Sequence, residues 1–416
     1  IPIYPLAARR KTPVSTPLRR TRGDFIAAAV ITVICVLCLG AAWLTAPIRT
    51  VELHPAAQEQ DNAGRLAAAP TTLTEHFRLV DDAPNAQPVV VDGLIITYRE
   101  EDKTVTATTA HGDTAWTYTR PEDLCALGQA WGKVVATYRT GVGCGDVVAI
   151  DALTGTHSGT RSAIAPSEIT LLHSNDRVGY AAASRVELWR SDMVRTVEYG
   201  EVEAPQEPEM QPHQCAVSSA LTRTELLAVT ESCADGAFLR FQDASPEDSR
   251  KPELLSSVEI APDAYLVAIG KDVAAIYDPA ASEIRSYNTE GDTVSISAVP
   301  ALDRPDKTLS GVVSPPVADL PHHMTFHDND TLVLMEPTNL AATGVFNGAL
   351  GTGFAAGDRL LYATDGGVAV VNWDTQAVEN IVTVDRGGYV GPVHVDSAGA
   401  TIVEKRGREI VVLDAS

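Results

Sequence analysis

The chain has 416 residues, 45% of them hydrophobic, and this is enough to bury a substantial core. The net charge is −22; residues 1–24 carry +5, so the remainder carries −27. A domain this acidic is not expected to bind nucleic acid or anionic lipid. Its negative charge is typical of a surface that keeps a protein soluble.

The N-terminal part of the chain has the pattern of a membrane anchor. Residues 1–24 are basic and proline-bearing and are predicted to be a disordered tail. Residues 25–46 follow as a predicted transmembrane helix, because the uncharged residues 25–44 span ~30 Å, the hydrocarbon thickness of a bilayer. Six basic residues precede the span and only Arg49 lies close behind it, which predicts a cytoplasmic N-terminus.

A cleaved signal peptide is the alternative for the same segment. Its apolar region is typically ~7–15 residues long and ends in small residues before the cut. The run here is longer and Pro47 follows Ala46 directly, so an uncleaved anchor is favoured. Residues 47–72 are rich in Ala, Pro and polar residues without a sustained period, and are predicted to be a flexible linker.

Four cysteines lie beyond the linker: Cys125, Cys144, Cys215 and Cys233. Four cysteines allow three connectivities, and the near-equal spacings of 19 and 18 residues favour Cys125–Cys144 and Cys215–Cys233. Disulfides persist outside the cytoplasm. Free buried thiols are the alternative, whereas the C-x-x-C spacing typical of zinc sites is absent.

From residue 73 onward, short β-rich runs alternate with Gly, Asp, Asn and Pro turns, and no long segment has a helical period. A layout of strand, tight turn and strand recurs in eight candidate units, which begin near residues 87, 124, 168, 214, 264, 322, 352 and 392. At ~40–50 residues per unit, residues 73–416 hold seven or eight blades of a β-propeller. The sequence therefore predicts an all-β propeller of seven or eight blades, preceded by one transmembrane helix.

Closure of the ring is predicted from a missing strand. The last unit is one strand short, and residues 73–80 are expected to supply it. A ring buries both faces of each four-stranded sheet and protects its edges. In each cysteine pair, the first cysteine is expected on the opening strand of a unit and the second near the end of the next strand.

Residues 149–155 read Ala-Ile-Asp-Ala-Leu-Thr-Gly, which resembles the A-x-D-x-x-T-G signature of quinoprotein-like (PQQ-like) propeller repeats. Degenerate versions end at Gly112 and Gln376, and the resemblance spans the predicted propeller. The whole chain resembles membrane-anchored propellers of actinobacterial envelopes. Quinoprotein dehydrogenases carry a vicinal disulfide and bind calcium, but no two cysteines are adjacent here, so no cofactor is expected.

The densest group of possible metal ligands lies in residues 321–330. His323, His327 and Asp330 would be the ligands. The residues around Thr325 alternate like a strand, however, which would place the two histidines ~13 Å apart. A solvated loop is therefore favoured over a metal site.

The acidic, proline-bearing insertions at residues 205–212 and 245–252 are read equally well as disordered loop tips or as contact loops. No G-x-S-x-G, Walker or H-E-x-x-H motif occurs in the chain.

The expected function is therefore non-enzymatic. The chain is predicted to be a scaffold or accessory subunit of a bacterial cell-envelope membrane complex, with a respiratory supercomplex and a cell-wall export or synthesis assembly as candidates. Its partners would be other membrane proteins, and the propeller would face the envelope from the cytoplasmic membrane. The alternatives are binding of an envelope glycan or small ligand in the central channel and, third, a degenerate quinoprotein enzyme.

Overall fold

The computed structural model describes residues 20–202, 210–211, 214–303, 305–321 and 323–416. The chain divides into two compact units, one ending at Val51 and the other running from Glu52 to Ser416. Each unit is described separately below.

The first unit is built on one long helix, α1 (Arg22–Thr45). A capping box fixes its start: the backbone N–H of Asp24 donates to Thr21 Oγ1, and the Asp24 carboxylate accepts from the backbone N–H of Thr21. The helix is long and apolar enough to cross a membrane. One 3₁₀ turn, η1 (Pro47–Thr50), follows, and the Arg49 guanidinium lies 4.3 Å from the centre of the Trp43 ring.

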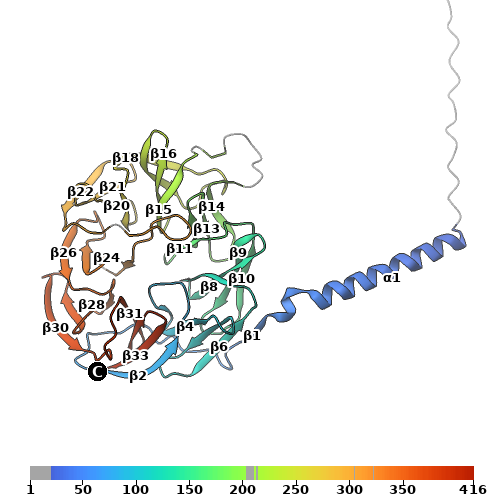
Figure 1. Ribbon diagram of the computed structural model, residues 1–416, viewed down its shortest axis with the longest axis horizontal. Helices are drawn as coiled ribbons and strands as arrows, with labels where there is room; N and C mark the ends of the chain where they lie inside the picture. Colours follow the sequence, from blue (N-terminus) through green and yellow to red (C-terminus); the bar gives the residue numbers. More distant parts are fainter. Residues whose placement is uncertain (1–19, 203–209, 212–213, 304, 322) are drawn as a thin grey trace, which may run out of the picture. The chain divides into compact units, whose positions relative to one another are not determined.

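The second unit is an eight-bladed β-propeller, which settles the number of blades that the sequence left open (Figure 1). Each blade is an antiparallel sheet of four consecutive strands, apart from a fifth strand on the first blade and an exchanged strand on the last. The first four blades contain, in order, β3 (Val89–Val91), β4 (Leu94–Arg99), β5 (Thr104–Thr108), β6 (Thr114–Thr119); β7 (Leu124–Ala130), β8 (Lys133–Thr140), β9 (Gly143–Asp151), β10 (His157–Ser162); β11 (Thr170–His173), β12 (Val178–Ala182), β13 (Arg185–Trp189), β14 (Arg195–Gly200); β15 (Ala216–Arg223), β16 (Leu226–Cys233), β17 (Gly236–Asp243) and β18 (Leu254–Ile260).

The other four blades complete the ring. They contain β19 (Tyr265–Ile269), β20 (Val273–Asp278), β21 (Glu283–Asn288), β22 (Thr293–Ala298); β23 (Val317–Asp319), β24 (Met324–Asp328), β25 (Thr331–Met335), β26 (Ala342–Asn347); β27 (Phe354–Ala356), β28 (Arg359–Thr364), β29 (Gly367–Asn372), β30 (Ala377–Thr383); and β31 (Val393–Ala398), β32 (Thr401–Arg406) and β33 (Glu409–Ala415).

The eighth blade takes its outermost strand from the start of the propeller. Strand β2 (Leu73–Val80) pairs antiparallel with β33, in a register that sets Leu73 opposite Ala415 and Val80 opposite Glu409. The predicted closure of the ring by residues 73–80 is thereby confirmed. The eighth blade therefore contains strands from both ends of the propeller, and their hydrogen bonds close the ring.

The segment expected to be a linker, residues 47–72, differs from that expectation. Strand β1 (Glu52–His54) pairs with β6 as the fifth strand of the first blade. Further along, the backbone N–H of Ala63 donates to the carbonyl of Asp92, and that of Gly399 donates to the carbonyl of Gly64. Backbone hydrogen bonds hold this segment against the propeller. Such bonds require no periodic pattern of side chains, so the contact could not be predicted from the composition of the segment.

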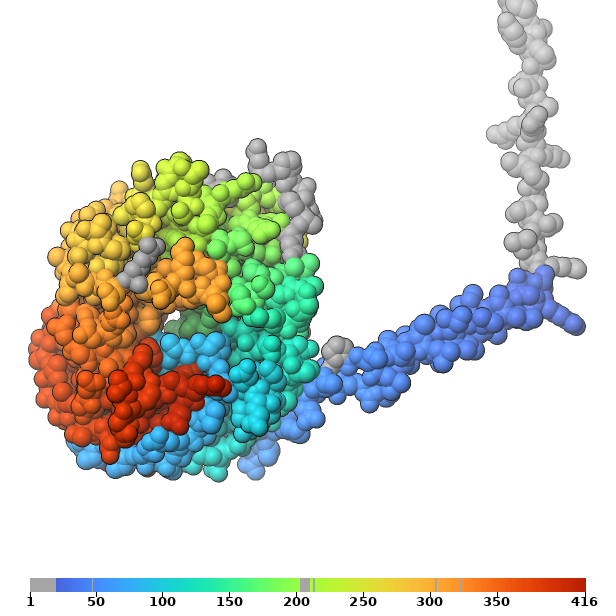
Figure 2. Space-filling view, in the orientation of Figure 1, coloured from blue at the N-terminus to red at the C-terminus, as the bar shows by residue number. Residues whose placement is uncertain are grey.

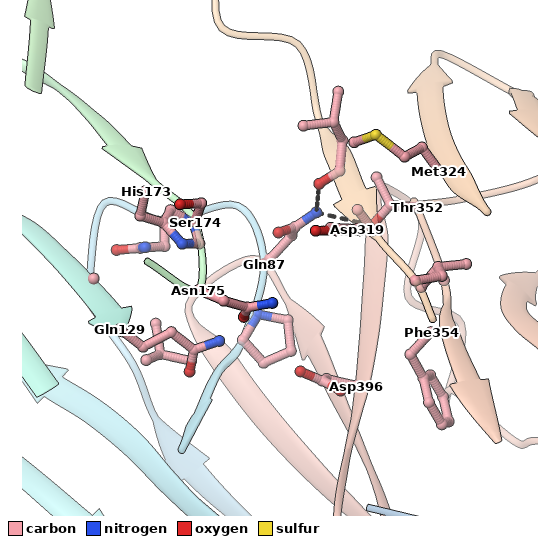
Figure 3. Close-up of a pocket in the computed structure, with 18 of the residues that line it drawn as sticks. Gln87, Gln129, His173, Ser174, Asn175, Asp319, Met324, Thr352, Phe354 and Asp396 are labelled. Carbon is pink, nitrogen blue, oxygen red and sulfur yellow. Dashed lines mark hydrogen bonds between the residues drawn. The ribbon is translucent and has the colours of Figure 1, made fainter. Parts of the chain in front are cut away.

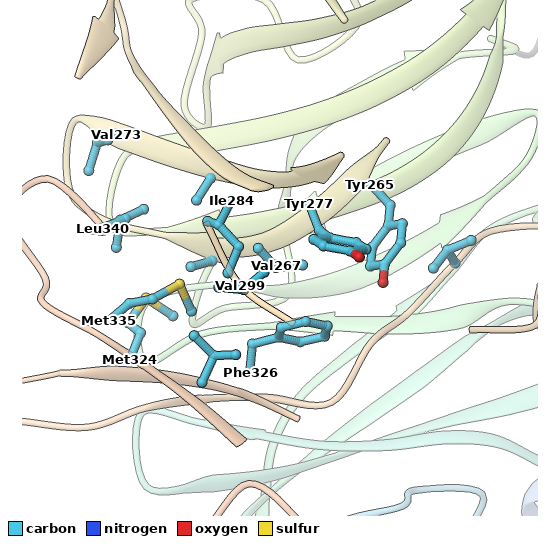
Figure 4. Close-up of a cluster of buried hydrophobic side chains, with 14 residues drawn as sticks. Tyr265, Val267, Val273, Tyr277, Ile284, Val299, Met324, Phe326, Met335 and Leu340 are labelled. Carbon is cyan, nitrogen blue, oxygen red and sulfur yellow. The ribbon is translucent and has the colours of Figure 1, made fainter. Parts of the chain in front are cut away.

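The hydrophobic core lies between the faces of neighbouring blades. The cluster in Figure 4 joins the fifth and sixth blades, where the ring centres of Tyr265 and Phe326 are 6.3 Å apart. Equivalent clusters join most of the other neighbouring blades. Burial of β-branched and aromatic residues between sheets is therefore what holds the ring together.

The A-x-D-x-x-T-G motif forms a turn that docks the preceding blade. Asp151 Oδ1 accepts hydrogen bonds from the backbone N–H and the hydroxyl of Thr154. Gly155 has a φ of 66°, and a Cβ there would lie 2.5 Å from the ring of Trp116. Trp116, on β6, donates from its indole nitrogen to the Ala152 carbonyl at 2.7 Å. The motif thus has a structural role, namely seating a tryptophan between two blades.

Candidate functional site: the central channel

The innermost strands of the eight blades surround a central channel, and the ring is hollowed there (Figure 2). One cavity in this channel has a volume of about 180 Å³ and is lined by residues from all eight blades. Because every blade contributes residues to the lining, residues far apart in the sequence converge on it.

Carboxamide side chains form much of the polar wall of the channel: Asn85, Gln87, Gln129 and Asn175 (Figure 3). Gln87 Nε2 donates across to the Val317 carbonyl at 3.0 Å and to Thr352 Oγ1 at 2.8 Å. The Oε1 atom of Gln129 is buried and accepts no hydrogen bond within the described part of the chain. A buried amide acceptor of this kind favours a ligand that donates hydrogen bonds.

Two carboxylates with arginine partners add charge to the channel. Asp319 lies 2.9 Å from Arg223, and Asp396 lies 3.8 Å from Arg65. Burial raises the pKa of both carboxyls, and the neighbouring arginines only partly offset this. Desolvation in the channel lowers the pKa of His173, which favours the neutral form of its imidazole. The channel therefore presents amides, carboxylates and a neutral imidazole to a bound molecule.

The docked N-terminal segment covers part of this channel. Asn62 Nδ2 donates to Asp92 Oδ1 at 3.0 Å, and the backbone N–H of Leu66 donates to Ser397 Oγ at 3.2 Å. Between these two anchors, Arg65 lines both the central cavity and an adjoining one of about 300 Å³. This role could not be predicted from the sequence, because the composition of the segment is typical of a linker.

The structure does not bring His323, His327 and Asp330 together as a metal site. His327 lies on β24, where it is buried and its Nε2 is 3.0 Å from the Ala349 carbonyl oxygen. The His323 ring lies 5.4 Å from the Trp373 ring, and Asp330 accepts a hydrogen bond from the hydroxyl of Thr331. The favoured solvated loop is also wrong for residues 324–328, which form the strand that the sequence indicated around Thr325, with its first four residues buried.

Among the described residues, one group has the spacing to hold a metal ion, and it consists of Cys215, Glu231 and Cys233. The Sγ atoms of Cys215 and Cys233 are at disulfide distance, 1.96 Å, which leaves no thiolate for a metal. Arg240 also holds Glu231 through an ion pair of 3.1 Å.

Both predicted cysteine pairs lie at disulfide distance. The Sγ atoms of Cys125 and Cys144 are 2.08 Å apart. Cys144 lies on β9, the third strand of its blade, and Cys215 lies just before β15, so both differ by a little from the expected strand positions. Irregular pairing on both sides of β8, at Leu124/Ala126 and Tyr138/Thr140, accompanies the close approach of β7 to Cys144.

The two acidic insertions have different outcomes. Most of residues 205–212 lies outside the described residues, although Gln211 donates to the Glu198 carbonyl at 2.9 Å. Residues 245–252 pack on β14, where the backbone N–H of Glu198 donates to the Ser249 carbonyl at 2.6 Å. The second insertion is therefore a docked loop that contacts the neighbouring blade.

No protein-family model and no curated protein sequence matches the chain. Solved structures with a similar fold include BamB from Moraxella catarrhalis, at 14% identity over 82% of this chain and 98% of that chain, with a TM-score of 0.46. Others are KlHsv2 with loop 6CD replaced by a Gly-Ser linker (11% identity, 80% and 98% covered, TM-score 0.43) and a chain of the Mitotic Checkpoint Complex (10% identity, 84% and 93% covered, TM-score 0.46). At these identities the likeness concerns the fold alone, and the propeller assignment rests on the eight sheets themselves.

Proposed function

We propose that this protein is a non-catalytic scaffold or accessory subunit of a membrane-bound protein complex. The observation that carries the proposal is an apolar rim on the outermost strands of four successive blades, β18, β22, β26 and β30. Six exposed aliphatic side chains, each 37–57% accessible, make up this rim: Leu255, Val294, Ile296, Val345, Val378 and Ile381.

The chemistry of these outer strands supports association. Strands β22 and β26 contain no charged residue, although the chain as a whole carries −22. Outer strands elsewhere are charged; β2, for example, contains Glu75 and Arg78. Exposed sheet edges are usually protected by charges, so uncharged apolar edges on adjacent blades are typical of a contact surface.

Helix α1 would place this surface at a membrane. Its apolar length and the basic residues before it favour a single pass with the N-terminus in the cytoplasm and the propeller in the cell envelope. Cysteine pairs at disulfide distance fit an oxidising compartment. The partners would then be other membrane proteins of a bacterial envelope complex, such as a respiratory supercomplex or a cell-wall export or synthesis assembly.

The test is co-purification of the full-length chain from native membranes in mild detergent. Replacing Val294 and Ile296 together with lysine should remove stoichiometric partners, because two desolvated charges would have to enter the interface. Val390→Lys is the matched control, since Val390 is 93% exposed but lies off the rim. Retention of the same partners by the double variant would refute the proposed contact surface.

A second candidate function is recognition of a glycan or other polar small molecule in the central channel. It is favoured by the converging carboxamides and by the unsatisfied Oε1 atom of Gln129. Sugar hydroxyls both donate and accept hydrogen bonds, and carboxamide side chains offer the matching acceptors and donors. Binding of envelope-derived oligosaccharides to the wild type, and its loss in Gln129→Leu, would support this function over the scaffold.

A further inference from the structure

The docked segment before β2 brings one basic side chain, Arg65, to the central channel. On one side of it, the backbone N–H of Ala63 donates to the carbonyl of Asp92. On the other side, the backbone N–H of Leu66 donates to Ser397 Oγ at 3.2 Å. The position of Arg65 is therefore fixed by its neighbours in the chain and not by contacts of its own side chain.

The turns that this segment crosses leave room for its backbone. Two of them contain a glycine, Gly93 between β3 and β4 and Gly357 between β27 and β28. A Cβ at Gly93 would lie 2.6 Å from the Cβ of Ala63. A Cβ at Gly357 would lie 2.5 Å from the carbonyl oxygen of Ala67. Because a side chain at either turn would collide with the segment, its place against the channel is built into the fold.

Arg65 lies at the junction of two cavities, which we call the neck. Four residues line both the cavity of about 180 Å³ and the adjoining one of about 300 Å³: Arg65, Gln129, Asn175 and Asp396. Figure 3 shows the carboxamides of Gln129 and Asn175 on one side and the carboxylate of Asp396 on the other. Among the described residues, Arg65 and Asp396 are the two charged ones that both cavities share.

The polar groups of the neck do not satisfy one another. Arg65 Nη1 and Asp396 Oδ1 are 3.8 Å apart, which is close enough for an ion pair but too far for a hydrogen bond. The other charged pair of the channel, Arg223 and Asp319, is closer, at 2.9 Å. Gln129 Oε1 is buried without a hydrogen-bond donor among the residues that the structure describes. The neck therefore keeps donors and acceptors that a ligand can use.

The two charges of the neck restrict the chemistry of that ligand. A neutral ligand would displace water from the Arg65 guanidinium and the Asp396 carboxylate without offering either of them a charge. A simple anion would be attracted by Arg65 and repelled by Asp396, and a simple cation would meet the reverse. A molecule with both charges side by side satisfies both groups, since its carboxylate accepts from the guanidinium and its ammonium donates to the carboxylate.

The cavity of about 180 Å³ would accept an apolar side chain of such a ligand. Leu221, Ile269, Met324 and Phe354 line this cavity and not the adjoining one. In Figure 3, Met324 and Phe354 lie across the channel from Gln129. A molecule whose charged groups bind at the neck can therefore bury an apolar group against these four side chains.

We propose that the neck binds the head group of an α-amino acid, with its carboxylate on Arg65 and its ammonium on Asp396. Both groups of such a ligand stand on one carbon atom, so they lie side by side as Arg65 and Asp396 do. The carboxamides of Gln129 and Asn175 supply further hydrogen bonds. The inference rests on the second candidate function, because it names the class of small molecule for the same channel, and it is independent of the scaffold.

The test is isothermal titration of the full-length protein in neutral detergent with L-leucine and D-leucine. We expect saturable binding of at least one of them. N-acetyl-leucine lacks the ammonium and leucine methyl ester lacks the carboxylate, so each should bind at least tenfold more weakly. Equal binding of leucine and both blocked compounds would overturn the proposal. Binding of an envelope-derived oligosaccharide but not of leucine would overturn it and leave the channel as a ligand site, whereas absence of both would remove the second candidate function as well.

Variants then assign each charge. Arg65→Gln should fold, because it removes only the 3.8 Å ion pair, and it should bind leucine at least tenfold more weakly and no longer prefer it to the methyl ester. Asp396→Asn should no longer prefer leucine to N-acetyl-leucine. Arg99→Gln is the matched control, since Arg99 is 55% exposed against 56% for Arg65 and pairs with Asp102 outside the channel. Unchanged leucine affinity in Arg65→Gln would contradict the assignment even if Asp396→Asn fails to fold.

Discussion

Leu73 lies directly opposite Ala415 in the eighth blade, so the first and last strands of the propeller are hydrogen-bonded neighbours. At the same edge, Thr71 donates from its hydroxyl to the carbonyl of Ser416 at 2.9 Å, across a sequence separation of 345 residues. The pairing of these two strands therefore contributes to the stability of the ring, because opening it would expose part of the core between the first and eighth blades.

Weakening the closing strand should destabilise the whole ring. Leu79, opposite Ile410, is half-buried on β2, and Leu79→Pro would distort the pairing of β2 with β33. We expect a loss of about 1–3 kcal/mol in the free energy of unfolding beyond that of Leu79→Ala, measured by thermal or urea unfolding. Equal stabilities of the proline and alanine variants would show that β2 does not close the ring.

The turn at Gly155 should not tolerate a side chain. Gly155→Ala places a Cβ against Trp116 and requires a positive φ, so we expect a loss of about 1–3 kcal/mol in the free energy of unfolding. Gly141→Ala is the control, because a Cβ there meets no atom within 4 Å. Quenching or a shift of the tryptophan emission should accompany the first change and not the second.

Stability should fall as the solution becomes acidic, through His394. Burial, together with the nearby His327 and Lys405, lowers the pKa of His394 to about 4 from an ordinary value of 6.5. Between these two values the unfolded chain binds a proton that the folded chain excludes, so lowering the pH through this range favours unfolding. The expected loss is about 3 kcal/mol between pH 6.5 and pH 4, and it levels off below pH 4.

The contribution of His394 can be isolated from that of other groups. The free energy of unfolding of His394→Gln should change less between pH 6.5 and pH 4 than that of the wild type, whatever the stability of the variant at pH 7. Thermal unfolding at closely spaced pH values measures both slopes. Parallel curves for the two proteins would mean that His394 does not titrate in this way.

The cysteine pairs should form disulfide bonds when the protein is isolated from an oxidising compartment. Non-reducing peptide mapping should recover Cys125 linked to Cys144 and Cys215 linked to Cys233. Each pair closes a loop of fewer than twenty residues, and the chain-entropy estimate gives a stabilisation of about 3 kcal/mol per bond. Recovery of free thiols, or of crossed pairs, would contradict the pairing.

Much of the fold could be predicted from local patterns in the sequence. Strand lengths, turn residues and the spacing of repeats are set by neighbours in the chain, and they indicated eight units with one missing strand. The pairing of the cysteines could be predicted for the same reason, since each pair lies within one blade at a separation of 19 or 18 residues. By contrast, the docking of residues 52–72 depends on backbone hydrogen bonds, which leave no periodic signal in the side chains.

The sequence by itself determined the long apolar helix, the all-β character of the domain that follows it and the closing strand, because periodicity and length are properties of contiguous residues. Only the tertiary structure decided the number of blades, the burial of His327, and the meeting of Arg65, Gln129 and Asp396 at the neck. These three residues come from the docked segment and from two different blades, and the interaction of Arg65 with Asp396 depends on distances in space that no spacing in the sequence specifies.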